Sequence, residues 1–177
     1  MKKITIDEEQ KKIAIDKLTK EWDLLKTSGL LSQIACSAGP QIIKRNNDRK
    51  PLYNMFKWNA TMKGPKKSPY EGFLFKFEIT YPPTYPNDPP TVTCKTKIYH
   101  MNISTDGDVC VSSIKEKEGW VKAGDISSVL LSIFVILGRP NTESPYRSSL
   151  AELYIKNNQE YRNNAREECK KYATQIS

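Results

Sequence analysis

The first part of the chain has the hydrophobic spacing of an amphipathic helix. Within residues 7–27, one face of a 3.6-residue period carries Ile15, Leu18, Trp22 and Leu25. Gly29 follows this stretch, and glycine at such a place typically caps the C-terminal end of a helix. The pattern therefore predicts a helix over 7–27 that packs through this stripe.

The middle of the chain has the period of two that is typical of half-buried strands. Apolar side chains occupy every second position over 56–62 and again over 73–79, and a short third run covers 91–94. Between the second and third runs, residues 81–90 include five prolines. Because proline fixes φ and has no N–H, that segment excludes a helix or a central strand. We expect three strands here, the last two joined by a rigid connector.

The C-terminal third returns to helical periodicity. Residues 126–138 are apolar on nearly every side, which predicts a buried central helix with Asp125 as its N-cap. In the last predicted helix, one stripe consists of Tyr161, Ala165, Cys169 and Tyr172. We interpret Cys169, and Cys94 at the end of a strand, as packed apolar side chains. Residues 41–51 are polar and basic, which predicts a long inserted loop between two strands.

Length and composition allow a single domain over residues 1–177. No apolar run approaches the roughly 20 residues of a membrane helix, and the N-terminus lacks the apolar core of a signal peptide. We therefore expect no membrane span and no export, and the four cysteines should be reduced thiols. With one histidine and no Cys-x-x-Cys pair, the sequence predicts no metal site.

The chain is basic, with a formal net charge of +8. Basic proteins often bind nucleic acid. Here the basic residues are scattered and interleaved with acids, and no nucleic-acid motif accompanies them. We interpret the charge as a solvated surface, suited to docking a protein partner, and the sequence argues against nucleic-acid binding.

The candidate chemistry lies in a stretch without clear period, residues 96–124. Cys110 follows Asn102 by eight residues, and Trp120 comes ten residues later. A thiol can carry an acyl group as a thioester, and an asparagine amide can donate a hydrogen bond to an oxyanion. Taken by itself, a cysteine is more often a packed structural thiol than a nucleophile. The loop position of Cys110, close to Gly107, favours the chemical interpretation.

A cysteine protease fits this segment poorly. Such an enzyme needs a strongly activated thiolate, which Asp106 and Asp108 would disfavour, and the only histidine, His100, is not placed as a partner for it. Transthiolation demands less of the thiol, because the incoming acyl group is already activated. The site must then supply an oxyanion donor, orientation and exclusion of water.

Several blocks of this sequence resemble the ubiquitin-conjugating enzymes, in that family's order, over about 14–173. The blocks are Cys36-Ser37-Ala38-Gly39-Pro40, Lys63-Gly64-Pro65 with Ser68-Pro69-Tyr70-Glu71-Gly72, Tyr85-Pro86 with Pro89-Pro90, Lys95-Thr96-Lys97-Ile98-Tyr99-His100, Asn102-Ile103 with Gly107 and Val109-Cys110, Trp120, and Pro140-Asn141. The resemblance implies a UBC-like fold of the α/β (α+β) class. That fold has an N-terminal helix, a four-stranded antiparallel sheet, a central helix and two C-terminal helices.

By this resemblance, Cys110 would accept ubiquitin from an activating enzyme as a thioester and pass it to a lysine of a substrate, usually with a RING-type ligase. The activating enzyme consumes the ATP, so the chain itself would need no cofactor. The resemblance implies a monomer in the cytoplasm or nucleus. Two alternatives remain: a carrier of a ubiquitin-like protein such as Nedd8, and a non-catalytic variant of the fold that binds ubiquitin or a ligase.

The resemblance also assigns roles to individual residues. Asn102 would stabilise the oxyanion or the loop, Ser144 would orient or deprotonate the incoming lysine, and Tyr99 would line the acceptor site. His100 and Trp120 would be structural. The positions that would face a ligase are Lys17, Asn87, Lys122 and Ala123.

The chain departs from the family at several places. The usual His-Pro-Asn is His100-Met101-Asn102, which loses the rigid proline and keeps the amide. The interval from Cys110 to Trp120 is longer than in typical members. On the ligase-facing surfaces, Asn87 replaces an aromatic residue of some members, and Val121-Lys122-Ala123 replaces the frequent Ser-Pro-Ala. These departures concern the stiffness of the loop and the choice of ligase.

Overall fold

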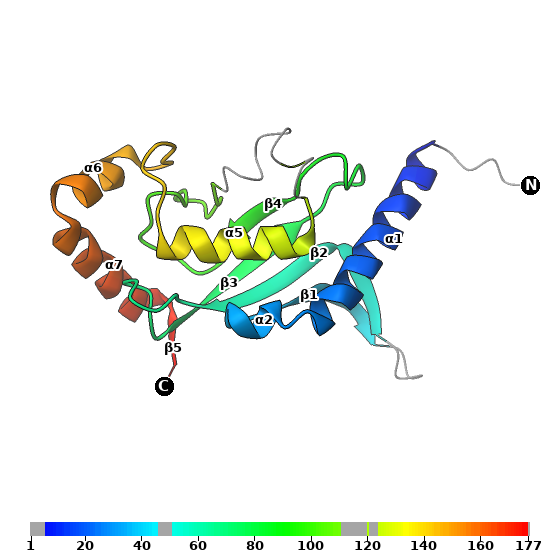
Figure 1. The fold of residues 1–177 in the computed structure, drawn as a ribbon, viewed down its shortest axis with the longest axis horizontal. Coiled ribbons are helices and arrows are strands. Elements are labelled where there is room, and N and C mark those ends of the chain that lie inside the picture. Colours follow the sequence, from blue (N-terminus) through cyan, green and yellow to red (C-terminus); the bar gives the residue numbers. More distant parts are fainter. Residues whose placement is uncertain (1–5, 46–50, 111–119, 121–123, 177) are drawn as a thin grey trace, which may run out of the picture.

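A computed structural model describes residues 6–45, 51–110, 120 and 124–176, which form an α+β fold (Figure 1). The helices are α1 (Ile6–Thr27), α2 (Leu30–Gln33), α5 (Ile126–Gly138), α6 (Ser148–Lys156) and α7 (Asn158–Tyr172), and the strands are β1 (Cys36–Arg45), β2 (Pro51–Lys63), β3 (Phe73–Thr80), β4 (Thr91–Cys94) and β5 (Thr174–Gln175). Helix α5 lies across one face of the sheet, with α1 at one end of the molecule and α6 and α7 at the other (Figure 1). Within the described ranges, no helix is long and apolar enough to cross a membrane.

The sheet is antiparallel, in the order β1-β2-β3-β4, and β5 pairs with β3 at Phe73 and Leu74. The predicted four-stranded sheet is confirmed, with the two-residue β5 added to it. Strand β3 has the predicted alternation, because its buried side chains are Phe73, Phe75, Phe77 and Ile79. This face of the sheet belongs to the same core as the buried side of α5.

The loop predicted over 41–51 is wrong at both ends. Strand β1 continues to Arg45 and β2 begins at Pro51, and these two residues still pair with each other. Polar composition did not exclude strand here, because backbone hydrogen bonds form a ladder whether or not the side chains are buried. The centre of the predicted loop, 46–50, lies outside the described residues.

Helix α5 has the predicted bounds and cap, since the Asp125 side chain accepts a hydrogen bond from Ser128 N at 2.7 Å. Its buried residues are Ile126, Val129, Leu130, Ile133, Ile136 and Leu137. The predicted buried central helix is buried on one side only, because Leu131 and Val135 are 45% and 50% exposed. The sheet covers only one side of this helix, so its outer side remains open (Figure 1).

Helix α1 has the predicted position but a shifted buried face. Its buried residues are Ala14, Leu18, Glu21 and Leu25. Ile15, predicted on this face, is 38% exposed, and Trp22 is only partly buried. Glu21 is buried because its carboxylate accepts hydrogen bonds from the Tyr85 hydroxyl (2.6 Å) and from Ile126 N (3.1 Å). The buried face of α1 therefore includes a charged residue that the predicted stripe did not contain.

The stripe predicted on the last helix is buried at Tyr161, Ala165 and Cys169 and exposed at Tyr172. The Tyr172 ring instead contacts a cation, the Lys97 ammonium, which lies 4.4 Å from the ring centroid. Cys169 and Cys94 are packed in the main core, as predicted.

Candidate thiol site

The segment that follows β4 brings Cys110 back beside Asn102. Cys110 N donates to Asn102 O at 2.8 Å, and Ile103 forms an antiparallel bridge with Val109. The turn of this small hairpin needs Gly107, which has a φ of +94° and whose absent Cβ would collide with the carbonyl oxygen of Cys94. The eight-residue interval thus returns the chain to the same place, and the thiol of Cys110 is partly buried there.

The other three thiols lie in places that suppress ionisation. Burial raises the pKa of Cys36 to about 11, and it raises the pKa of both Cys94 and Cys169 to about 12. A thiol must ionise to act as a nucleophile, so these three are suited to packing. Cys110 is the remaining candidate for acyl transfer.

The side chain of Asn102 is fully buried and bonded to the loop that follows α5. Its Nδ2 donates to Asn141 O at 2.7 Å and to Ser144 O at 3.3 Å, and its Oδ1 accepts from Asn141 N at 2.9 Å. Both amide hydrogens are thereby used on this loop. Of the two roles that the resemblance implied, this geometry favours stabilising the loop, and a role at the oxyanion stays a prediction.

His100 is fully buried and its proton can be located. Its Nδ1 accepts from Asn102 N at 3.0 Å, so Nε2 carries the hydrogen and donates to Ile136 O at 3.0 Å. Burial lowers the pKa of His100 to about 4, and the charge of Arg147 acts in the same direction. A neutral imidazole whose two nitrogens are both bonded is suited to a structural role, and that role of His100 stays a prediction.

Met101, which stands where the resemblance expects proline, is fully buried against α6 and α7. Its side chain packs in a small cluster with Leu150, Ala151 and Tyr161. Its backbone N–H donates to the Tyr161 hydroxyl at 3.3 Å. Met101 is thus held by packing and by hydrogen bonds to the rest of the fold.

Trp120 is buried and holds the proline-rich segment. Its Nε1 donates to Pro86 O at 2.6 Å, and its ring centroid lies 5.8 Å from that of Tyr85. The predicted structural role therefore has a physical basis in this indole hydrogen bond. Trp120 is linked through Tyr85 to the buried Glu21 of α1.

Three of the remaining predicted residues, Lys17, Asn87 and Ser144, lie at the surface. Ser144 is exposed, and it meets the site through its backbone carbonyl, which accepts from Asn102. Asn87 is exposed in the proline-rich segment, and Lys17 on α1 has its Nζ 3.0 Å from Glu21 Oε1. Lys122 and Ala123 lie outside the described residues. The catalytic and ligase-facing roles of these residues stay predictions.

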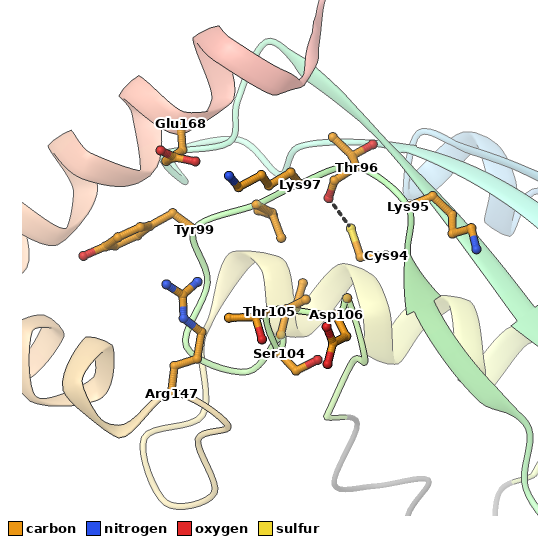
Figure 2. Close-up of a pocket in the computed structure, with 13 residues that line it drawn as sticks. Cys94, Lys95, Thr96, Lys97, Tyr99, Ser104, Thr105, Asp106, Arg147 and Glu168 are labelled. Carbon is orange, nitrogen blue, oxygen red and sulfur yellow. Dashed lines mark hydrogen bonds between the residues drawn. The ribbon is translucent and has the colours of Figure 1, made fainter.

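A cleft of about 680 Å³ opens beside this hairpin, with Tyr99 and residues 103–107 in its wall (Figure 2). Arg147, from the segment before α6, places its guanidinium 5.4 Å from the centroid of the Tyr99 ring. In Figure 2, Glu168 of α7 and Asp106 lie at opposite sides of the cleft. Tyr99 therefore lines a cleft, and its role at an acceptor site stays a prediction.

Arg147 was missed by the sequence reasoning. It lies in a short connection with no periodicity, and only the tertiary structure brings it against Tyr99. The part of the chain that the structure describes also contains no group of three His, Cys, Asp or Glu side chains that could hold a metal.

A comparison with protein-family models places this arrangement among known proteins. The family described as ubiquitin-conjugating enzyme matches residues 31–169. The matched span includes the whole four-stranded sheet, the thiol hairpin and helices α5 and α6.

Proposed function

Because the chain belongs to the ubiquitin-conjugating enzyme family, we propose that it carries ubiquitin, or a ubiquitin-like protein, on Cys110 and transfers it to a lysine of a substrate. Members of this family work with ubiquitin, an activating enzyme and a ligase. The observation that most supports the proposal is the placement of Cys110, a partly buried thiol held by its own backbone against Asn102.

The reaction proceeds in two acyl transfers. In the first, the Cys110 sulfur loses its proton and attacks the thioester carbonyl carbon on the activating enzyme, whose thiolate leaves. In the second, the neutral ε-amine of a substrate lysine attacks the new thioester. The C–S bond breaks, the Cys110 thiolate is regenerated, and the amine loses a proton as the isopeptide bond forms. The activating enzyme consumes the ATP, and the chain itself uses no cofactor.

Asn102 supports the second step by holding the 141–144 loop. To donate to an oxyanion, its amide would have to release Asn141 O or Ser144 O, and so give up a part-buried hydrogen bond that holds the loop. The bonds to this loop place Ser144, whose hydroxyl then orients the incoming lysine. The amide thus acts through the loop that it positions.

The cleft beside Tyr99 receives the part of the substrate around the acceptor lysine. Its wall carries cations (Lys97 and Arg147) as well as acids (Asp106 and Glu168), so it selects an acceptor segment by charge pattern. The surface containing Lys17 and Asn87 faces a RING-type ligase. The protein acts as a monomer in the cytoplasm or nucleus, without membrane or nucleic-acid partners.

The test is adduct formation with activating enzyme, ATP and ubiquitin, analysed on a non-reducing gel. We expect an adduct that thiols cleave in the unchanged protein, a thiol-resistant oxyester or no adduct with Cys110→Ser, and an unchanged adduct with Cys36→Ser as the matched control. Absence of an adduct with ubiquitin and with every ubiquitin-like protein would overturn the proposal. Binding of free ubiquitin without an adduct would then support the non-catalytic variant.

Replacing Asn102 tests the second step. Asn102→Ala should slow lysine transfer from the loaded protein about 100-fold, because a misplacement of about 1 Å costs about that much, and should leave thioester loading nearly unchanged. Because we place its role in the loop, amide exchange at Asn141 should rise in the same variant. Slow transfer with unchanged amide exchange at Asn141 would instead support a role for Asn102 as a hydrogen-bond donor to the oxyanion.

A further inference from the structure

The residue between His100 and Asn102 is tied to helix α7 through its own backbone amide. Met101 N donates to the Tyr161 hydroxyl at 3.3 Å, and Met101 O accepts from Tyr146 N and Arg147 N at 2.9 and 3.0 Å. Proline, the usual residue at this position in the family, has no N–H and cannot make the first of these bonds. The bond to Tyr161 therefore depends on the residue type that this chain has at position 101.

The bond belongs to a directed series of hydrogen bonds. The Tyr70 hydroxyl donates to Tyr99 O at 2.7 Å and lies 3.4 Å from the Tyr161 hydroxyl. A backbone N–H can only donate and a carbonyl can only accept, so the direction is determined. Met101 N–H donates to Tyr161, Tyr161 donates to Tyr70, and Tyr70 donates to Tyr99 O. The series starts and ends on one loop, at residues two positions apart.

The series is shielded from water and remains protonated. The side chains of Tyr70, Met101 and Tyr161 are 0%, 0% and 1% exposed. Burial raises the pKa of Tyr70 and of Tyr161, so both hydroxyls keep their hydrogens at neutral pH. Without water to replace Tyr161, the Met101 N–H would have no partner, and a buried N–H without a partner is strongly disfavoured.

We propose that Tyr161 is a positioning residue of the thiol site, and that helix α7 uses its hydroxyl to hold the His100–Asn102 loop in place of the missing proline. The loop in turn places the amide of Asn102, which holds residues 141–144. The effect on lysine transfer rests on the proposed function, whereas the hydrogen bond itself can be tested without any reaction.

The first experiment measures amide hydrogen exchange by NMR on the unmodified chain and on Tyr161→Phe. We expect exchange at Met101 to become about tenfold faster or more, because its acceptor is gone. Exchange at Asn102, whose N–H donates to His100 Nδ1, should change much less. Tyr70→Phe is the matched control, because it leaves the bond from Met101 to Tyr161 in place. Unchanged exchange at Met101 in Tyr161→Phe, or an equal rise in Tyr70→Phe, overturns the proposal.

The second experiment measures single-turnover transfer from the Cys110 thioester to free lysine over a range of lysine concentrations. Tyr161→Phe should lower the maximal rate about tenfold while thioester loading and the half-saturating lysine concentration stay the same. In the Met101→Pro background, which has no N–H at this position, adding Tyr161→Phe should change the rate less than about twofold. In the Met101→Ala background, which keeps the N–H, the tenfold effect should return.

These backgrounds separate positioning from a general loss of packing. Equal slowing by Tyr161→Phe in the proline and alanine backgrounds overturns the proposal, because the effect would not depend on the N–H. If Met101→Pro fails to fold, loss of the effect in the Met101→Ala background still overturns it. If the unchanged protein forms no thioester, the proposed function fails, and the exchange experiment decides the hydrogen bond separately.

Discussion

Helices α1 and α7 lie at opposite ends of the molecule, and each reaches the surroundings of the thiol site through one buried polar side chain (Figure 1). From α1, the Glu21 carboxylate accepts bonds from Tyr85 and from Ile126 N at the start of α5. From α7, the Tyr161 hydroxyl accepts from Met101 N and passes its own hydrogen towards Tyr70. One contact is charged and the other is neutral.

This difference determines how many hydrogen-bonding groups lose their partner when each contact is removed. A carboxylate accepts several strong, charge-assisted bonds at once, so its loss leaves several buried donors without partners. In the neutral series each hydroxyl accepts one bond and donates one, so the loss of a hydroxyl leaves only one donor and one acceptor without partners. We therefore expect the α1 contact to dominate stability and the α7 contact to adjust the geometry of the site.

The largest effect is expected at Glu21. Glu21→Ala should lower the free energy of unfolding by about 4 kcal/mol, because the Tyr85 hydroxyl and Ile126 N–H both lose a charged acceptor. Urea unfolding measures this change. Asp23→Ala, an exposed acid on the same helix, is the matched control and should change stability by less than about 0.5 kcal/mol. Equal losses in the two variants would show that the buried carboxylate has no special role.

The pH dependence of the free energy of unfolding tests whether His100 is buried in its neutral form. The pKa of His100 is about 4 in the folded state and 6.5 unperturbed, so the unfolded chain binds more protons between these values. Stability from this group is complete above about pH 6.5 and falls as the pH decreases towards 4, by about 3 kcal/mol in total. In His100→Gln this part of the pH dependence should disappear. Parallel curves for the two proteins would contradict the buried neutral state.

Two tyrosine-to-phenylalanine changes compare the contacts directly. Tyr85→Phe removes a donor to a carboxylate and should lower the free energy of unfolding by about 2 kcal/mol. Tyr161→Phe removes a neutral acceptor and should lower it by about 1 kcal/mol. Thermal and urea unfolding of both variants measure the ratio of the two losses in the free energy of unfolding. A larger loss at Tyr161 would reverse the assignment of the charged contact as the stronger one.

The smallest effect is expected at Lys17, which pairs with Glu21 from the solvent side. Its side chain is 44% exposed, so solvent screens the pair. Lys17→Gln should lower the free energy of unfolding by less than about 1 kcal/mol, and the difference should shrink further at high salt. A loss as large as that of Glu21→Ala would mean that the ion pair, and not the hydrogen bonds, stabilises the carboxylate.

The elements themselves could be predicted wherever the signal was local. The bounds of α5 follow from a continuous apolar run with Asp125 before it, and the burial of β3 follows from its alternation. The prediction was wrong where burial depended on a distant partner. Glu21 was not part of the predicted stripe, yet its carboxylate is buried because it accepts a bond from Tyr85, 64 residues later. Leu131 and Val135 were expected to be buried, yet nothing in their spacing tells which side of α5 the sheet covers.

The sequence by itself determined the family, the candidate thiol Cys110 and its interval from Asn102. Motifs and short-range spacing are properties of the chain alone. Only the tertiary structure decided that the Asn102 amide is bonded to residues 141–144 and that Met101 is held by Tyr161, 60 residues later. The physical reason is that a buried polar group takes the partner that packing brings to it, and the sequence interval between such partners carries no periodic signal.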